Sequence, residues 1–452
     1  MLTDLKKMNS YHWLEVKTAL KLERLLKIIK TLFTSMINNS IAYIQFPGSN
    51  TENETINMIK KCGMSPHPHF WNDEPKNLDK YSGYIILGGF SFEDRSRSGI
   101  IASLEPVMQE IKKQAQAGKP VLGICNGAQI LVESGLVPGN NDLSTLVSLT
   151  DNKRVIKNKI IGTGYYNTWC YVKPNPNASS AFTKEGGSIL KVPIAHAEGR
   201  FVLDKDLSNV VLEKNLITYR YCNENGDEIE DFPVNPNGSF GNAAAISNIS
   251  GNVMAMMPHP ERTINGEGDE IFENLREYIN SSDKVSYKSL NFESKKIKIN
   301  SFEKKNDSKE VLVSTIISDN EALSVEKCIN NLGFNVKIKK YIHYEIEGVC
   351  DSDLEGVLAT DVLFNPSKEY VSKIKRDSSK KHFLTRSYDD VHGKSLLQAL
   401  RIRFGFDSLS SLKKGVVWEI AFNGDAPRKK DVDLILNSHI FANPISQACH
   451  EY

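Results

Sequence analysis

Between residues 41 and 135, short apolar runs alternate with longer amphipathic runs, and this alternation restricts the possible folds more than any other feature. It predicts strands at "IAYIQF" (41–46), "GYIILGG" (83–89) and "PVLGIC" (120–125), and helices over residues 53–62, 103–118 and 126–135. Strands and helices that alternate over short connections form an α/β fold, a mostly parallel sheet with helices on both faces. Ligands of such sheets bind beyond the carboxyl ends of the strands, where Gly88, Gly89 and Cys125 are expected.

The length and composition restrict the class of protein. A chain of 452 residues is too long for one ordinary core and favours about three domains. With 40% hydrophobic residues, 25% charged residues and a net charge of +1, it has a globular composition and no charge excess to attract nucleic acid or a membrane surface. The seven cysteines lack Cys-x-x-Cys spacing, which argues against disulfides and a metal site and fits a reducing cytoplasm. No apolar run is long enough for a membrane span.

Composition and pattern divide the chain into five segments. These are an amphipathic N-terminal extension (1–40), a first domain (41–280), a polar linker with room for one short strand (281–308), and two small repeats (309–380 and 381–452). The extension is compatible with a targeting or membrane-surface helix. A helix that packs on the body, or an upstream start site before Met36, is the favoured interpretation.

The two repeats share one layout. In each, a helical run leads to Gly-Phe, a strand with Glu-Ile, a second helical region and Asn-Pro, at Asn365-Pro366 and at Asn443-Pro444. Repeats of this kind pair and complete each other's core. We therefore expect two β-α-β units in a pseudo-dimer, without catalytic residues.

The stretch "GICNG" (123–127) places Cys125 between two glycines where a predicted strand turns into a helix. In a nucleophile elbow, flanking glycines allow a tight bend and leave the side chain at the tip exposed. The N-terminus of a helix also stabilises a thiolate. A lone cysteine before a helix is more often structural, but this setting favours a nucleophile.

A cysteine nucleophile needs a base, and the base needs a group that orients it. In "MAMMPHPER" (254–262), His259 lies between two prolines, which restrict the backbone, and Glu261 follows two residues later. We expect Glu261 to hold one ring nitrogen while the other faces the thiol. The alternative is a loop histidine beside a surface carboxylate.

Acyl transfer also needs donors for the developing oxyanion. The backbone N–H groups of Gly88 and Gly89, together with that of Asn126, are the candidates. An ordinary glycine turn is the structural alternative for the Gly pair.

These motifs together resemble those of the class I glutamine amidotransferases, and most closely the PurQ-type glutaminase subunits of phosphoribosylformylglycinamidine synthases. The resemblance covers about residues 41–278 and is carried by "QFPGSNTENE", "LGGFSFEDRSRSGIIA", "GICNGAQIL", "IAHAEGRF", "NPNGSFGNAAAI" and "MMPHPER". Gly-x-Cys-x-Gly alone would indicate only the amidotransferase class. The remaining motifs are much more specific.

The resemblance implies that Cys125 attacks the carboxamide of glutamine and forms a thioester, while His259 transfers the proton and Glu261 holds the imidazole. It also implies that ammonia passes to a separate synthetase subunit, which binds ATP and Mg, and that this chain carries no cofactor or metal. His196, Glu198 and Arg200 of "HAEGRF" would position groups or contact a partner. For His196, a role as a second base remains open.

The tail resembles two copies of the small PurS-type subunit of the same synthase, which in that family dimerises and bridges glutaminase and synthetase. The cues are the Gly-Phe pairs, the Glu-Ile strands and the "LFNP" and "IFANP" endings. The expected protein is therefore a cytoplasmic glutaminase fused to its adaptor. An amidotransferase that feeds another acceptor and a non-catalytic scaffold of the complex remain alternatives.

Overall fold

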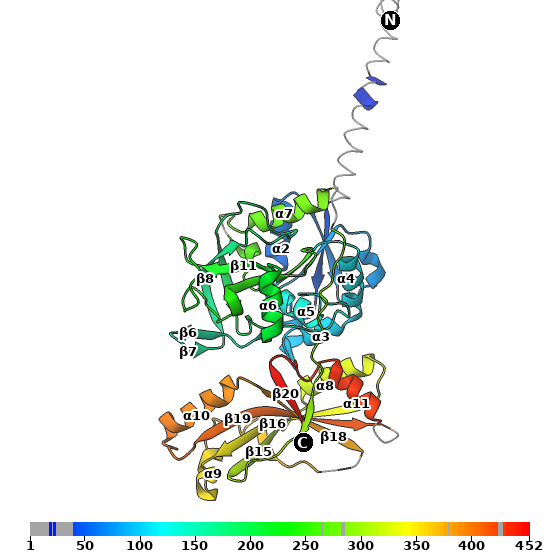
Figure 1. Cartoon of the computed structure of the whole chain (residues 1–452). Helices are drawn as coiled ribbons and strands as arrows, with labels where there is room; N and C mark the ends of the chain where they lie inside the picture. The colour runs from blue at the N-terminus through cyan, green and yellow to red at the C-terminus, as the bar shows by residue number, and fades with distance from the viewer. Residues whose placement is uncertain are drawn as a thin grey trace, which may run out of the picture.

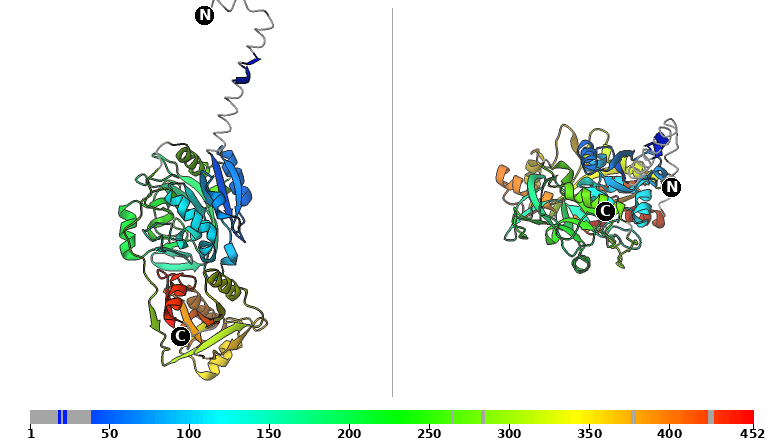
Figure 2. Two further views of the ribbon diagram at one scale, coloured as in Figure 1. Left: turned by 90° about the vertical axis from the view of Figure 1, so that its right-hand side faces the viewer. Right: turned by 90° about the horizontal axis from the view of Figure 1, so that it is seen from above.

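The computed structural model describes residues 18–19, 21–23 and 39–452, except residues 264, 282–284, 376, 378 and 424–427. Most of the predicted N-terminal extension, with Met36, lies outside the described residues. The remainder forms an N-terminal module (residues 39–292) and a C-terminal module (residues 299–452), stacked one on the other (Figures 1 and 2).

A nine-stranded mixed sheet forms the centre of the N-terminal module. Its order is β2 (Ser65–Phe70), β1 (Ser40–Gln45), β3 (Gly83–Ile86), β4 (Val121–Ile124), β13 (Val253–Met256), β12 (Ala243–Ser247), β11 (Ile217–Cys222), β8 (Tyr166–Pro174) and β9 (Leu190–His196). The strands from β2 to β13 are parallel, and those from β13 to β9 pair antiparallel. The α/β prediction is confirmed, although the sequence analysis did not resolve the antiparallel half.

The helices of this module are α2 (Glu52–Lys61), α3 (Ile100–Leu104), α4 (Pro106–Gln116), α5 (Asn126–Glu133), α6 (Lys205–Glu213) and α7 (Asp269–Asn280). The prediction of one helix over residues 103–118 is wrong. Pro106 begins α4 and Glu105 before it is extended, because a proline disfavours helical geometry in the preceding residue. Among the described residues, no helix has the length and apolar character needed to cross a bilayer.

Two smaller sheets of two antiparallel strands each complete the N-terminal module. They are β5 (Ser148–Thr150) with β10 (Arg200–Val202), and β6 (Lys153–Ile156) with β7 (Lys159–Thr163). The stretch "SPHPHF", for which no element was predicted from the sequence, forms the edge strand β2. An edge strand tolerates its prolines because one side needs no ladder hydrogen bonds.

The C-terminal module is a seven-stranded sheet with helices packed on it. Along the chain its elements are β14 (Ile299–Ser301), β15 (Ser308–Thr315), α8 (Asn320–Asn331), β16 (Val336–Glu347), α9 (Asp351–Leu358), β17 (Glu369–Ser372), β18 (Lys380–Ser387), α10 (Val391–Phe404), β19 (Ser411–Phe422), α11 (Lys429–Asn437) and β20 (Gln447–Glu451). The sheet order is β14-β20-β18-β19-β16-β15-β17, so the two repeats lie side by side through β16 and β19. Each repeat is β-α-β-α-β: the second helical region of the predicted layout is present as α9 and α11, and a third strand, β17 or β20, extends the predicted β-α-β unit.

The repeats share their cores. Val325 and Ile329 of α8, in the first repeat, pack in one cluster with Ile435 and Leu436 of α11, in the second, over the buried Trp418 of β19. A second cluster joins α9 and α10 in the same crossed manner. Neither repeat could bury its apolar face alone, which is the physical reason for the pseudo-dimer.

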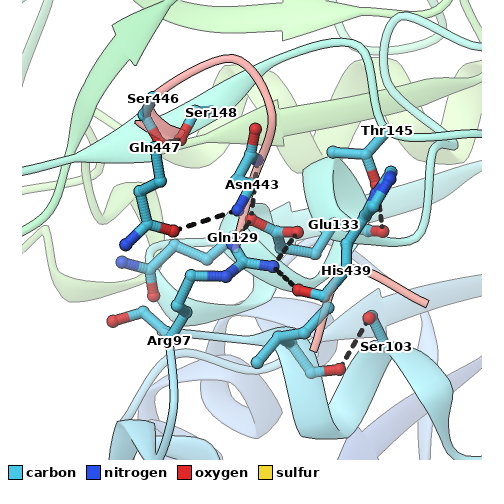
Figure 3. A network of polar contacts seen from close by, with 12 residues as sticks. Arg97, Ser103, Gln129, Glu133, Thr145, Ser148, His439, Asn443, Ser446 and Gln447 are labelled. Atoms are coloured by element: carbon cyan, nitrogen blue, oxygen red, sulfur yellow. Dashed lines mark hydrogen bonds and ion pairs between the residues drawn. The ribbon is translucent and has the colours of Figure 1, made fainter. Parts of the chain in front are cut away.

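The two modules meet at α3 and at the carboxyl end of α5. Arg97 pairs with Glu133, the last residue of α5, and its guanidinium also donates to the carbonyl of His439 at 2.6 Å (Figure 3). Asn443 donates to Glu133 Oε1 and to the carbonyl of Val147, both at 3.1 Å. The C-terminal module therefore contacts the helix whose other end lies at Cys125.

Candidate active site

Cys125 lies between β4 and α5, with φ 52° and ψ −108°. A non-glycine residue at positive φ is strained, and such strain is typical of a nucleophile held at a strand–helix turn. Its N–H donates to the carbonyl of Met256 at 2.8 Å, which fixes the turn against β13. Cys125 is only 6% exposed, so the predicted exposure of the tip is wrong: the residue packs with the apolar core of the module.

The two flanking glycines serve close packing. Neither Gly123 nor Gly127 has a positive φ, so neither supplies the bend that the sequence analysis assigned to them. A Cβ on Gly127 would lie 2.1 Å from the carbonyl oxygen of Ile86, and one on Gly123 would lie 2.4 Å from the carbonyl oxygen of Gly127. Glycine is required because α5 rests directly on the strands.

His259 follows β13 and is 2% exposed. Its Nδ1 lies 2.7 Å from Oε1 of Glu261, which is also buried, and its backbone N–H donates to the carbonyl of Pro193. Its Nε2 has no hydrogen-bond partner in the described part of the chain, and the sulfur of Cys125 is close enough to act on the charge of the ring. The structure thus brings together the three residues that the sequence analysis grouped.

The charge of His259 depends on a balance of opposing effects. Burial alone would lower the pKa of its imidazole, but the Glu261 carboxylate and the Cys125 sulfur outweigh burial and raise the pKa to about 10. The carboxylate and the sulfur therefore favour the protonated form of the ring.

The predicted oxyanion donors are not equally available. The N–H of Gly88 donates to Oγ1 of Thr51 at 3.1 Å, so it is occupied in this conformation. Gly88 does lie at the site, because a Cβ there would meet Cε1 of His259 at 3.2 Å. Asn126 is the first residue of α5, so its N–H has no acceptor within the helix. The amides of Gly89 and Asn126 thus remain the candidate pair.

His196 ends β9 and is buried. Its Nδ1 lies 3.2 Å from Oδ1 of Asn152, and its Nε2 is unpartnered in the described part of the structure. Burial, with a smaller contribution from the charge of His259, lowers the pKa of His196 to about 3. A neutral imidazole beside the protonated one is suited to positioning.

The other two residues of "HAEGRF" face the interface between the modules. Glu198 accepts a hydrogen bond from Ser98 at 2.9 Å, and its carbonyl accepts from Gln129 of α5 at 2.7 Å. Burial and the charge of Asp151 raise the pKa of the Glu198 carboxyl. Arg200 lies 3.5 Å from Asp389 of the C-terminal module, so in this structure it contacts the adjoining module of the same chain.

The side chains that surround the first turn of α5 were not predicted from the sequence. The side-chain amide of Asn126 donates to Oε1 of Gln129 at 2.8 Å and to Asp94 at 3.3 Å. Burial and the charge of Glu198 raise the pKa of Asp94 to about 7. The four-residue spacing from Cys125 to Gln129 was a usable signal, because it places both on one helix face. Within the described residues, no group of three or more His, Cys, Asp or Glu side chains is arranged to hold a metal ion.

Comparison with known proteins identifies the N-terminal module. Residues 38–291 match the CobB/CobQ-like glutamine amidotransferase domain. The chain belongs to this family of glutamine amidotransferases. The fold and the amidotransferase activity that the motifs implied are those of the family.

Two relatives in the family are named phosphoribosylformylglycinamidine synthase subunit PurQ. That of Methanothrix thermoacetophila is 42% identical over 257 residues, which are 53% of this chain and 97% of the relative. That of Methanocaldococcus jannaschii is 38% identical over 224 residues, 49% of this chain and 88% of the relative. A solved structure, PurLQS from Thermotoga maritima, is 30% identical with a TM-score of 0.42, and the match covers 53% of this chain and 98% of that one.

Proposed function

We propose that this chain is the glutaminase component of phosphoribosylformylglycinamidine synthase, in de novo purine biosynthesis. The observation that carries the proposal is the buried series formed by Cys125, His259 and Glu261, with 2.7 Å between imidazole and carboxylate. Relatives of which the chain covers 88–97% bear the name of that subunit. The alternative of a different ammonia acceptor keeps the same chemistry.

The chemistry proceeds by acyl transfer. The sulfur of Cys125 bonds to the carboxamide carbon of glutamine, and the amides of Gly89 and Asn126 stabilise the oxyanion. The C–N bond then breaks while protonated His259 gives its proton to the leaving nitrogen, which departs as ammonia. Water attacks the thioester as His259 takes up its proton, so glutamate leaves and the thiolate is restored. Glu261 keeps the imidazole oriented and stabilises its charged form.

The ammonia is used elsewhere. In this proposal it passes to a separate ATP-dependent synthetase subunit, which binds ATP and Mg, while this chain needs no cofactor. The repeats of the C-terminal module act as a PurS-like adaptor between the two enzymes. The complex works in the cytoplasm, which suits the free thiols of the described cysteines.

The test uses the full chain with the purified synthetase. Cys125→Ala should abolish glutamine-dependent synthesis of phosphoribosylformylglycinamidine and leave synthesis from ammonium salts unchanged. Cys350→Ala, which removes an exposed thiol, is the matched control and should leave both activities intact. Glutamine-dependent synthesis by Cys125→Ala would refute the assigned nucleophile. Glutamine hydrolysis without any support of that synthetase would favour another acceptor.

A further inference from the structure

The two repeats contain the same turn after their second helix. In the first repeat, the Asn365 N–H donates to the side chain of Glu369 at 2.8 Å, and Oδ1 of Asn365 accepts from the N–H of Ser367 at 2.9 Å. In the second, the Asn443 N–H donates to Gln447, and its Oδ1 accepts from Ile445.

Strand registers extend this equivalence to the neighbouring residues. Val313 pairs with Val371 in the first repeat, as Thr385 pairs with Cys449 in the second. The N–H of Ile316 donates to the carbonyl of Lys368 at 2.8 Å. In the same way, the backbone N–H of Tyr388 donates to the carbonyl of Ser446 at 2.9 Å. It follows that position 371 corresponds to 449, 368 to 446 and 317 to 389.

In the second repeat this surface is covered, by the N-terminal module at Asn443 and by strand β14 of the C-terminal module at the sheet edge. Asn443 is fully buried because its amide donates to Glu133 and to the carbonyl of Val147 in the N-terminal module. Along the edge of the sheet, β14 pairs with β20, with Ile299 opposite Cys449, which is 2% exposed.

In the first repeat the corresponding surface is open. Asn365 is exposed, and its side-chain amide donates to no group among the described residues. Strand β17 ends the sheet, with no strand on its outer side among the described residues. Four apolar side chains gather beside it: Ile316 is 59% exposed, Ile317 72%, Tyr370 49% and Val371 46%. We call Ile316, Ile317, Asn365, Lys368, Tyr370 and Val371 the first-repeat face.

The first-repeat face lacks a charge that the corresponding surface of the second repeat carries. Asp389 pairs with Lys153 and Arg200 of the N-terminal module, and its counterpart is Ile317. A second amidotransferase module on the first-repeat face would set two cations against isoleucine, which costs their desolvation without a partner. The face therefore fits a different protein, one with an apolar surface and an acidic group opposite Lys368.

We propose that the first-repeat face binds the synthetase subunit, while the second repeat holds the amidotransferase module. The inference rests on the proposed function for the identity of this partner. It assigns opposite roles to two halves that share one fold. The main-chain groups at the outer edge of β17 and the Asn365 amide give the partner hydrogen bonds, and the apolar side chains give it buried area.

The experiment measures binding of the full chain to the purified synthetase by sedimentation velocity. Ile317→Asp combined with Val371→Asp should weaken binding about tenfold or more. The synthetase would bury both side chains, and a charge placed at an apolar contact that binding buries has an effect of this size. Leu434→Asp, which changes a side chain 51% exposed on α11 of the second repeat, is the matched control and should bind as the wild type does. Melting curves of both variants should match the wild type, since the altered side chains are exposed.

The outcomes are distinct. Wild-type affinity in the Ile317→Asp/Val371→Asp variant would overturn the assigned surface and leave the proposed function standing. Self-association of the wild type that this variant abolishes, with synthetase binding unchanged, would show that a second copy occupies the face, and would also overturn the inference. A wild-type chain that hydrolyses glutamine but never binds the synthetase would overturn the inference and the proposed pathway together.

Discussion

Replacement of Arg97 by methionine tests how the C-terminal module is anchored to the nucleophile helix. The side chains of Arg97 and Glu133 are 11% and 4% exposed, and both terminal nitrogens of the guanidinium, Nη1 and Nη2, reach the carboxylate, with Nη2 3.0 Å from Oε2 (Figure 3). In Arg97→Met the carboxylate stays buried with Asn443 as its remaining side-chain donor. The carbonyl of His439 loses a donor as well.

The expected magnitude follows from these contacts. Removing one partner of a buried ion pair costs about 3–5 kcal/mol, because the other charge remains desolvated. Methionine keeps most of the apolar stem, so lost packing adds little. Glu133→Gln keeps one acceptor for the guanidinium and should cost less, about 1–3 kcal/mol. In the double variant Arg97→Met/Glu133→Met neither charge is stranded, so its cost should fall below the sum of the two single methionine variants by about 2 kcal/mol or more.

The assay is urea unfolding of the full chain, with hydrogen exchange followed by mass spectrometry because two modules need not unfold as one unit. Relative to the wild type, the rate of amide hydrogen exchange in Arg97→Met should rise in α5 and in residues 439–447, and should change least in strands β1 and β3. A loss of less than about 1 kcal/mol for this variant, or strict additivity in the cycle, would refute the claim that the pair is buried and coupled.

Three further outcomes follow from the active site. Glu261→Gln should lower kcat for glutamine about 100-fold or more with little change in KM, because the imidazole loses the carboxylate that orients and charges it; an equal effect on KM would contradict a positioning role. Gly127→Ala should lower the melting temperature sharply or prevent folding, since its Cβ would lie 2.1 Å from a backbone oxygen of Ile86; a wild-type melting curve would contradict this packing. The folded pKa of Asp94 is raised from 3.8 to about 7, so its protonation stabilises the fold fully below about pH 4 and this contribution is lost as the pH rises through 7. Between about pH 4 and pH 8, the free energy of unfolding of Asp94→Asn should therefore fall by up to about 4 kcal/mol less than that of the wild type, as measured by urea unfolding. A pH profile identical to that of the wild type would contradict the raised pKa.

Much of the site could be predicted because its parts are local in sequence. His259 and Glu261 are two residues apart on one proline-restricted turn, so their contact needs no long-range information. Cys125 could be recognised because the spacing of the apolar residues on either side of it indicates a strand followed directly by a helix. The role of Gly127 was misjudged, because the carbonyl that excludes a side chain there belongs to Ile86, on a strand far away in sequence.

The amino-acid sequence by itself determined the alternation of strands and helices, the order of the three candidate catalytic residues and the existence of two repeats. Each of these depends on spacing along the chain, which periodicity and turn chemistry express directly. Only the tertiary structure decided that the amide of Gly88 is occupied by Thr51 and that Asn443 is buried while Asn365 is exposed. The physical reason is that two nearly identical turns acquire different surroundings from partners such as Glu133, which lies 310 residues from Asn443 and which no local pattern can name.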